Sequence, residues 1–189
     1  MNQDEYFSVN TGLTINVEPL DSDARLPDEL EFIKEIPPLF RVASECSSLE
    51  ESADRSLAGF GKDESKALLA HLATQNSKIN LLLSFVLSQQ DDPALRYITE
   101  TFGASKLTFI SETPFIGGNS VRVKLFLDHP PAAIYCYAEV SNCEARDDKF
   151  EVTLRYNRLQ EDDRDLLIRA ALNIQQKLLR QRAQQRTDA

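Results

Sequence analysis

Hydrophobic positions change their spacing along the chain, and these changes divide it into four zones. Residues 63–90 repeat apolar residues with a helical period, and residues 91–160 alternate apolar and polar residues as strands do. Residues 161–189 return to a helical period, whereas residues 1–62 are acidic and interrupted by prolines. The pattern predicts an α+β protein in which a small antiparallel, Greek-key-like β-barrel lies between a long N-terminal heptad helix and a C-terminal helix.

The N-terminal zone, residues 1–62, is expected to be only partly ordered. Its stretch LPDELEFIKEI can form a short helix from Pro27, where the missing amide proton costs nothing. The Pro37-Pro38 pair then ends that helix. The stretch SSLEESADRSLAGFG predicts a second short helix that ends at Gly59.

A heptad repeat runs through residues 63–90, which contain no proline or glycine. Leu72, Ile79 and Val86 recur every seven residues and take heptad position a. The residues four before each take position d, and the residues three before each take position e. Together these sets form a wide stripe over about 40 Å of helix, and a polar pair in its middle would fix the register of an assembly. The predicted interface residues are Leu68, Leu69, Leu72, Gln75, Asn76, Ile79, Leu82, Leu83 and Val86.

Two interpretations of this helix stay open. It can lie with its apolar side on its own domain, or it can pack against the same helix of other copies. The width of the stripe favours a bundle of three or four helices. In contrast, β-branched Ile79 and Val86 at heptad position a, with Leu82 at position d, favour a dimer. Because the stripe is wide, we predict a homo-oligomer, with a tetramer favoured.

Residues 91–160 carry the strand pattern. In VRVKLFL, Val121, Val123, Leu125 and Leu127 share one face, and AIYCYAEV and KFEVTLRY alternate in the same way. The acidic turn EARDDK joins the last two runs as a hairpin, and PFIGGNS supplies another turn. Five or six short strands at this spacing predict the small antiparallel barrel.

The last zone, residues 161–189, predicts a C-terminal helix with a basic tail. It opens with EDDRD, whose acids complement a helix N-terminus, and closes with KLLRQRAQQR, whose cations suit a C-terminus. Leu167, Ala171, Ile174 and Leu178 form an apolar stripe between them. We interpret the basic tail as dipole compensation and solvated surface.

Composition narrows the class of protein. A formal net charge of −9 argues against a broad surface for nucleic acid or anionic membranes, which requires a basic field. The longest strongly apolar stretch, INLLLSFVL at 79–87, is too short to span a bilayer, and MNQDEYFSVNTG lacks the features of a signal peptide. The three cysteines have no metal-ligand spacing and are interpreted as reduced thiols. We predict a cytoplasmic protein with no nucleic-acid partner and no membrane span.

No pattern in the sequence indicates catalysis. The two histidines, His71 and His129, have no partner at metal-ligand or triad spacing. The fragment GFGK at 59–62 lacks the third glycine of a dinucleotide fingerprint, and we interpret it as a helix stop. Turn and helix-start roles explain the acid pairs at 147–148 and 162–163. We therefore predict that the protein is not an enzyme and uses no cofactor or metal.

Residues 91–182 resemble a PilZ domain, a bacterial family known chiefly for binding cyclic di-guanylate. The resemblance rests on GASKLTFISETPFIGGNSVRVKLFL, on IYCYAEV and on FEVTLRYNRLQEDDRDLLIRAALNIQQKLLR. The preceding helix, with NSKINLLLSFVL, resembles that of a variant branch of the family. The resemblance implies a small barrel followed by a C-terminal helix, and a regulatory role in bacterial signalling.

The ligand motifs of that family do not match this chain. The first, Arg-x-x-x-Arg before the barrel, grips phosphates and guanine edges, but here Arg96 is followed four residues later by Glu100. The second, Asp/Asn-x-Ser-x-x-Gly, falls on Thr101, Gly103 and Lys106, and none of the three is the required residue. The resemblance therefore implies an atypical PilZ-like protein that lacks the cyclic di-guanylate motifs.

Three functional hypotheses follow. The first is a non-enzymatic, oligomeric adaptor or regulatory protein of cyclic di-guanylate-related signalling or motility, whose partners are other copies of itself and proteins of those systems. The second is a true cyclic di-guanylate receptor with a non-standard site at Arg96, Lys106 or Arg122. The third sets the family aside and treats the chain as a structural β-barrel oligomer. Cyclic di-guanylate is an unlikely ligand under the first and third.

Overall fold

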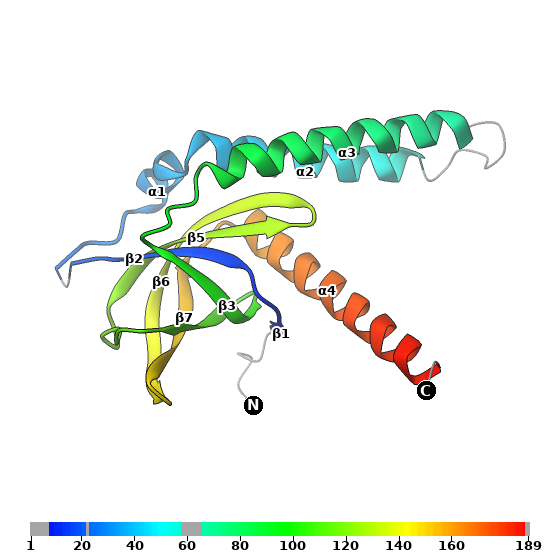
Figure 1. Ribbon diagram of the computed structural model, residues 1–189. Helices are drawn as coiled ribbons and strands as arrows, with labels where there is room; N and C mark the ends of the chain where they lie inside the picture. Colours follow the sequence, from blue (N-terminus) through cyan, green and yellow to red (C-terminus); the bar gives the residue numbers. More distant parts are fainter. Residues whose placement is uncertain (1–7, 22, 58–65, 188–189) are drawn as a thin grey trace, which may run out of the picture.

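The computed structural model describes residues 8–21, 23–57 and 66–187. A β-barrel forms the centre of the molecule, helices α1, α2 and α3 lie over one side of it, and α4 runs outward from one end (Figure 1). In chain order the elements are β1 (Ser8–Asn10), β2 (Thr14–Pro19), α1 (Glu29–Glu35), α2 (Pro38–Leu57), α3 (Lys66–Ser88), β3 (Arg96–Gly103), β4 (Lys106–Ser111), β5 (Ser120–Asp128), β6 (Pro131–Arg146), β7 (Lys149–Arg158) and α4 (Glu161–Thr187).

The barrel is antiparallel and closed. Its strands follow the order β3-β2-β5-β6-β7-β4, and β4 pairs with β3 to complete the circle. The tight turn between β6 and β7 contains Asp147 at a φ of 54°, a left-handed conformation that Asp tolerates better than most residues. The architecture is thus the α+β barrel that the twofold alternation predicts.

Two strands of the sheet come from the N-terminal zone, outside the range 91–160 expected for the barrel. β2 pairs along its length with β5 and also with β3, and β1 lies opposite the end of β3. The alternation of Ile15 and Val17 with polar neighbours is a usable signal for β2, but it covers only six residues in a zone interrupted by prolines. Closing the barrel requires a strand between β3 and β5, and the N-terminal zone supplies it.

Of the two helices expected in the N-terminal zone, α1 is shorter than its predicted run and begins at Glu29 instead of Pro27, whereas α2 is longer and begins at Pro38. Asp28 caps α1 and accepts from the Glu31 amide at 2.9 Å, which completes a capping box. The Pro37-Pro38 pair ends this helix, but Pro38 also begins α2, where a proline is compatible with the first turn. The predicted end of the second helix at Gly59, and residues 63–65 of the heptad zone, lie outside the described residues.

One hydrophobic core fills the barrel. Alternate residues of β5, including Val121, Val123 and Leu125, point inward, as the pattern predicts. The inner side of α4, with Leu167 and Ala171, packs against the same core. Burying such side chains contributes about 1.5–3 kcal/mol each, so α4 is an integral part of the domain.

A second hydrophobic cluster lies on the outer face of β6. Tyr135 and Tyr137 alternate with the inward residues of this strand, and Phe32 of α1, Phe40 of α2 and Leu87 of α3 cover them. This is why both faces of β6 are buried.

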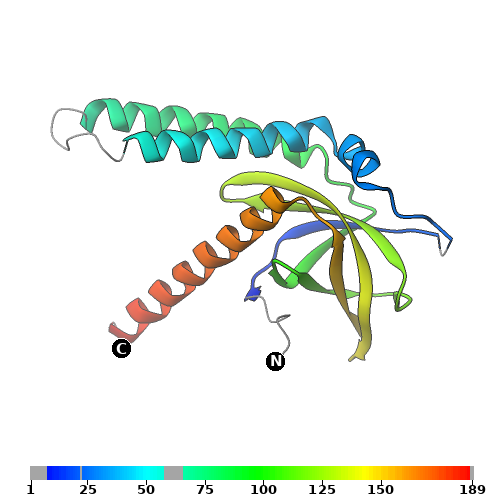
Figure 2. The same ribbon diagram turned by 180° about the vertical axis from the view of Figure 1, so that it is seen from behind.

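α2 and α3 lie side by side and extend beyond the barrel, as seen from both sides (Figure 2). No helix within the described residues is long and apolar enough to cross a membrane.

Candidate functional site

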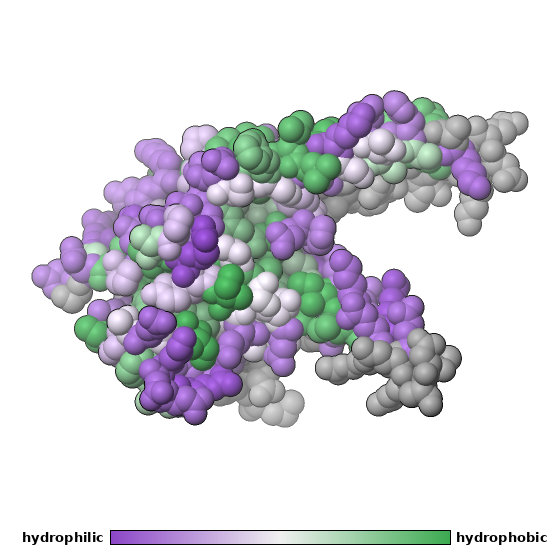
Figure 3. Space-filling view, in the orientation of Figure 1, coloured by the Kyte–Doolittle hydropathy of each residue, from purple (hydrophilic) through white to green (hydrophobic). Residues whose placement is uncertain are grey.

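The exposed side of α3 carries a row of apolar residues. The a and d positions of the predicted heptad are all exposed: they are Leu68, Leu72, Gln75, Ile79, Leu82 and Val86. Ile79 is 52% exposed and Leu82 is 68% exposed, although both sit within a well-formed helix. Figure 3 shows apolar side chains gathered along the upper helix. Exposed apolar rows of this length mark interaction surfaces more often than ordinary surface.

The e positions of the same heptad behave differently. Leu69, Asn76 and Leu83 are half-buried, and Leu83 packs against the cluster on the outer face of β6. The predicted stripe is therefore divided: its e side faces the chain's own body, and its a and d side remains exposed. Packing on the chain's own domain thus describes the e side of α3, and packing of the a and d side against other copies stays a prediction.

The exposed apolar surface of α3 extends beyond the predicted residues. Leu81 is 71% exposed and Phe85 is 66% exposed, and they are four residues apart on one side of the helix. Their spacing in the sequence was a usable signal, but the heptad assignment put them outside the a, d and e set. We call the a and d residues, with Leu81 and Phe85, the α3 surface.

The degenerate ligand motif lies where β3 turns into β4. The hydroxyl oxygens of Thr101 and Thr108 are 2.8 Å apart across the two strands, so Thr101 is already hydrogen-bonded. Gly103 is buried and lies opposite Ser8 of β1. Lys106 is exposed and lies opposite Arg155 of β7. β1 pairs along this edge of β3, and none of the three residues carries a carboxylate.

The turn itself is held by two elements distant in sequence. Arg164, in the first turn of α4, donates to the Ala104 carbonyl at 2.7 Å. The Tyr156 amide donates to the Ser105 carbonyl at 3.0 Å. Ala104 is buried, so both contacts fix the turn against the body of the domain.

The three cations of the alternative site are not brought together. Arg96 pairs with Asp91 at 2.7 Å, and Arg122 pairs with Glu18 at 2.8 Å. Arg96 starts β3 and Lys106 follows its end, so an eight-residue strand of about 23 Å separates them. A dianionic nucleotide needs several cations converging on one place, and this arrangement does not supply them.

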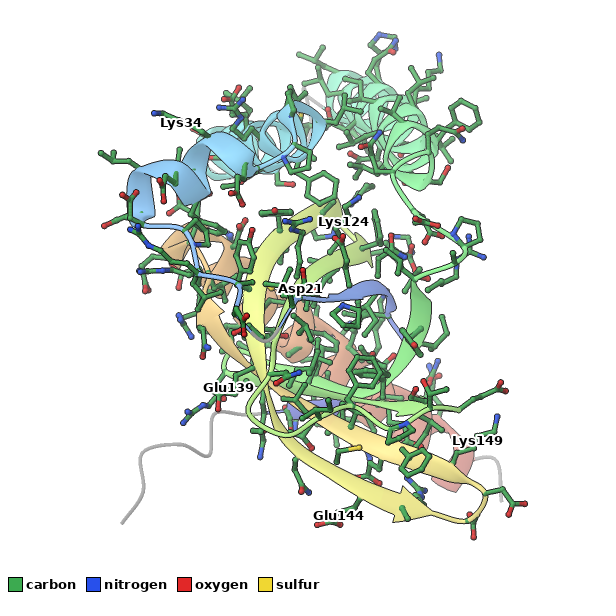
Figure 4. The ribbon with its side chains drawn as sticks, turned by 90° about the vertical axis from the view of Figure 1, so that its left-hand side faces the viewer. Asp21, Lys34, Lys124, Glu139, Glu144 and Lys149 are labelled. Atoms are coloured by element: carbon green, nitrogen blue, oxygen red, sulfur yellow. The ribbon has the colours of Figure 1, made fainter. Side chains whose placement is uncertain are left out.

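Arg122 serves instead in a network that fixes α1 to the barrel. Its guanidinium donates to the Tyr137 hydroxyl at 3.4 Å, and the Tyr137 hydroxyl donates to Glu35 of α1. Partial burial alone would lower the pKa of Arg122, but the hydrogen bond to Tyr137 and the nearby charges raise it overall. In Figure 4, Lys124 of the same strand lies between the barrel and the helices, where it donates to the Gln90 carbonyl at 3.4 Å.

A buried group of titratable residues lies under the start of α4. Burial, and then the charge of Asp162, raise the pKa of Asp163 to about 7. Burial also raises the pKa of the Cys136 thiol, which leaves it protonated and unreactive. The Tyr156 hydroxyl is buried without a hydrogen-bond partner. Among the described residues no three His, Cys, Asp or Glu side chains are placed to hold a metal ion.

Comparison with solved structures identifies the class of fold. No family model matches the sequence, and no curated protein matches it in sequence. The chain instead has the fold of PilZ-domain proteins, with a barrel followed by a C-terminal helix.

Two such structures are a motility inhibitor and a tetrameric protein. The Bacillus subtilis inhibitor of motility MotI/DgrA superposes with a TM-score of 0.50 at 11% identity, over 94% of this chain and 53% of that one. This chain therefore spans about half the length of MotI/DgrA. A Xanthomonas campestris PilZ protein superposes with a TM-score of 0.55 at 15% identity, over 93% of this chain and 91% of that one. The latter is described as a tetramer self-assembled through an unusual helical bundle.

Proposed function

We propose that this protein is a non-enzymatic, PilZ-like oligomeric adaptor of bacterial cyclic di-guanylate-related signalling or motility. It works in the cytoplasm, does not bind the dinucleotide itself, and contacts other signalling or motility proteins. The observation that carries the proposal is the α3 surface, in which the a and d residues of a heptad stay exposed on a formed helix. The described fold of a tetrameric PilZ protein that assembles through helices supports the same use of α3.

The proposed assembly is a tetramer built on the α3 surface. Burying Ile79, Leu82 and their equivalents in a bundle removes apolar area from water, at about 25 cal/mol per Å². Exposed Leu81 and Phe85 widen the surface beyond a two-stranded seam, which favours more than two helices. Gln75, between the apolar layers, would fix the register of the bundle.

The test is to measure the mass of the full chain by light scattering in about 0.5 M salt. At this concentration the Debye length is about 4 Å, so contacts between surface charges are screened and contacts between apolar residues remain. The wild-type protein should be a tetramer, and Ile79→Asp with Val86→Asp should give a folded monomer. Ala73→Asp with Ser84→Asp adds the same charges at exposed α3 positions outside the α3 surface and should leave the mass unchanged. An unchanged mass for the first pair, with unchanged circular dichroism, would refute α3 as the interface.

The absence of dinucleotide binding rests on the motif turn. Thr101 is bonded to Thr108, Gly103 is covered by β1, and the two candidate arginines are each paired with a carboxylate. Calorimetric titration with cyclic di-guanylate should give no heat of binding. The second candidate function, a receptor with a non-standard site, takes precedence if micromolar binding is measured and is lost on Lys106→Ala or Arg122→Ala.

A further inference from the structure

The C-terminal part of α4 concentrates positive charge in an otherwise acidic protein. Residues 166–187 contain five cations and no carboxylate, while the whole chain carries a formal net charge of −9. The stabilising effect of a helix dipole on cations falls off within the last turn. It therefore does not account for Lys177 or Arg180, which precede the last turn of the helix.

The outward side of this helix is also apolar. Leu172 is 43% exposed and Leu179 is 56% exposed, and seven residues bring them to the same side of the helix. Gln176 and Arg180 are exposed on that side too. Figures 1 and 2 both show the C-terminal half of α4 standing clear of α2 and α3. A helix with spaced apolar anchors and flanking cations is suited to docking in a groove of opposite charge.

A groove with complementary chemistry lies at the other end of the molecule. Its volume is about 540 Å³, and it runs between α1 and the link from β7 into α4. Glu29, Glu161 and Asp162 supply carboxylates, and Ile33 and Leu159 supply apolar contacts.

The charges that line this groove leave a small acidic excess. Arg164 and Glu161 pair with each other at 3.6 Å, so Glu29 and Asp162 remain against Arg158. Residues 18–35, which include α1, contain seven carboxylates against two cations. The groove therefore lies in an acidic part of the chain.

One chain cannot bring the two surfaces together, because α1 and the C-terminal end of α4 lie on opposite sides of the molecule (Figures 1 and 2). We propose that the outward side of α4 in one copy docks in the acidic groove beside α1 of a second copy. Two copies side by side in opposite directions make this contact twice, as a two-fold symmetric interface requires. This self-contact goes beyond the α3 seam and is sensitive to salt, because opposite charges meet at it.

Charge reversal in the full chain tests the contact, with Ile79→Asp and Val86→Asp included to remove the α3 seam. At about 50 mM salt this protein should dimerise in sedimentation equilibrium, and at about 0.5 M salt the dimer should dissociate. Adding Gln176→Glu and Arg180→Glu on the outward side of α4, or separately Glu29→Lys and Asp162→Lys in the groove, should weaken dimerisation about tenfold or more, since each places like charges together.

Mixing the two reversed proteins is the decisive step. Both contacts of the mixed pair are again between opposite charges, so a heterodimer should form at low salt although neither protein dimerises alone. Lys106→Glu with Arg155→Gln makes the same charge change as the α4 reversal, but on the exposed residues of β4 and β7, and should leave dimerisation unchanged. The proposal is overturned if the mixed pair fails to associate. It is also overturned if the control substitutions on β4 and β7 weaken dimerisation as much as the α4 reversal does, because dimerisation would then depend only on net charge.

The failures of the two self-contacts can be told apart. If the protein with the α3 substitutions is a monomer at both salt concentrations, the α4 contact is refuted, while the proposal of an α3 seam still stands. An unchanged tetramer at high salt refutes the α3 seam, and the charge reversals then test the α4 contact in the wild-type background at low salt.

Discussion

Arg164 of α4 donates a hydrogen bond to the carbonyl of Ala104 at 2.7 Å, across sixty residues of sequence. This contact fastens the C-terminal helix to the turn in which PilZ-like ligand residues would stand. The neighbouring Ser105 carbonyl accepts from the amide of Tyr156. The turn is thus held by contacts within the chain itself.

Removing this guanidinium should destabilise the domain. Arg164→Ala leaves the buried Ala104 carbonyl without its charged donor, which should lower the free energy of unfolding by about 1–3 kcal/mol in urea denaturation. The control is Arg158→Ala, an exposed cation of the same region, which should change it by no more than about 0.5 kcal/mol. Equal effects of the two substitutions would argue that Arg164 acts only through its charge.

Asn16 should be one of the most sensitive polar residues. It is buried, its amide donates to Asp91 at 2.7 Å, and its carbonyl oxygen accepts from the Asp92 amide at 2.8 Å. Asn16→Ala leaves the Asp92 amide without this acceptor and Asp91 with only its ion pair to Arg96, and should lower the free energy of unfolding by about 1–3 kcal/mol. Exposed Asn157→Ala is the control in the same thermal or urea unfolding series. A loss below about 0.5 kcal/mol would show that water replaces the Asn16 contacts.

Asp163 should make stability fall as pH rises. Burial first, and Asp162 second, raise its pKa to about 7 from an ordinary value of 3.8, so the folded state holds the proton more tightly than the unfolded state. Its contribution is fully present below about pH 4 and is lost between about pH 4 and pH 7, by on the order of 3 kcal/mol.

Asp163→Asn isolates this effect. The amide stays neutral, so the substituted protein should exceed the wild type in stability at pH 8 and match it near pH 4. Asp165→Asn, an exposed acid two residues on, should leave the pH profile unchanged. Parallel profiles of urea midpoint against pH for Asp163→Asn and the wild type would contradict the raised pKa.

Restoring the second ligand motif should not restore binding. Thr101→Asp, Gly103→Ser and Lys106→Gly together rebuild the motif, but the arginine pair before the barrel is still missing. Calorimetry with cyclic di-guanylate should show no binding by the folded triple variant. Micromolar binding would mean that the arginine pair is dispensable here.

The sequence by itself determined the local elements. Alternation in VRVKLFL and AIYCYAEV specified which residues of β5 and β6 face inward, because a strand turns its side chains to opposite faces at every residue. The heptad at Leu72, Ile79 and Val86 specified the row that stays exposed on α3. The assignment of Thr101, Gly103 and Lys106 to the positions of a ligand motif rests on the sequence alone and stays a prediction.

Only the tertiary structure decided which distant segments meet. The short alternating run of β2 does not show which strands it joins, and in the fold it lies between β3 and β5, where it closes the barrel. The heptad stripe could not reveal that Leu83 packs inward while Leu82 stays exposed, since that depends on where α3 lies against the second cluster. Charge along the chain showed an acidic start and a basic end. Their separation to opposite sides of the molecule follows from the barrel, which fixes where α1 and α4 leave it.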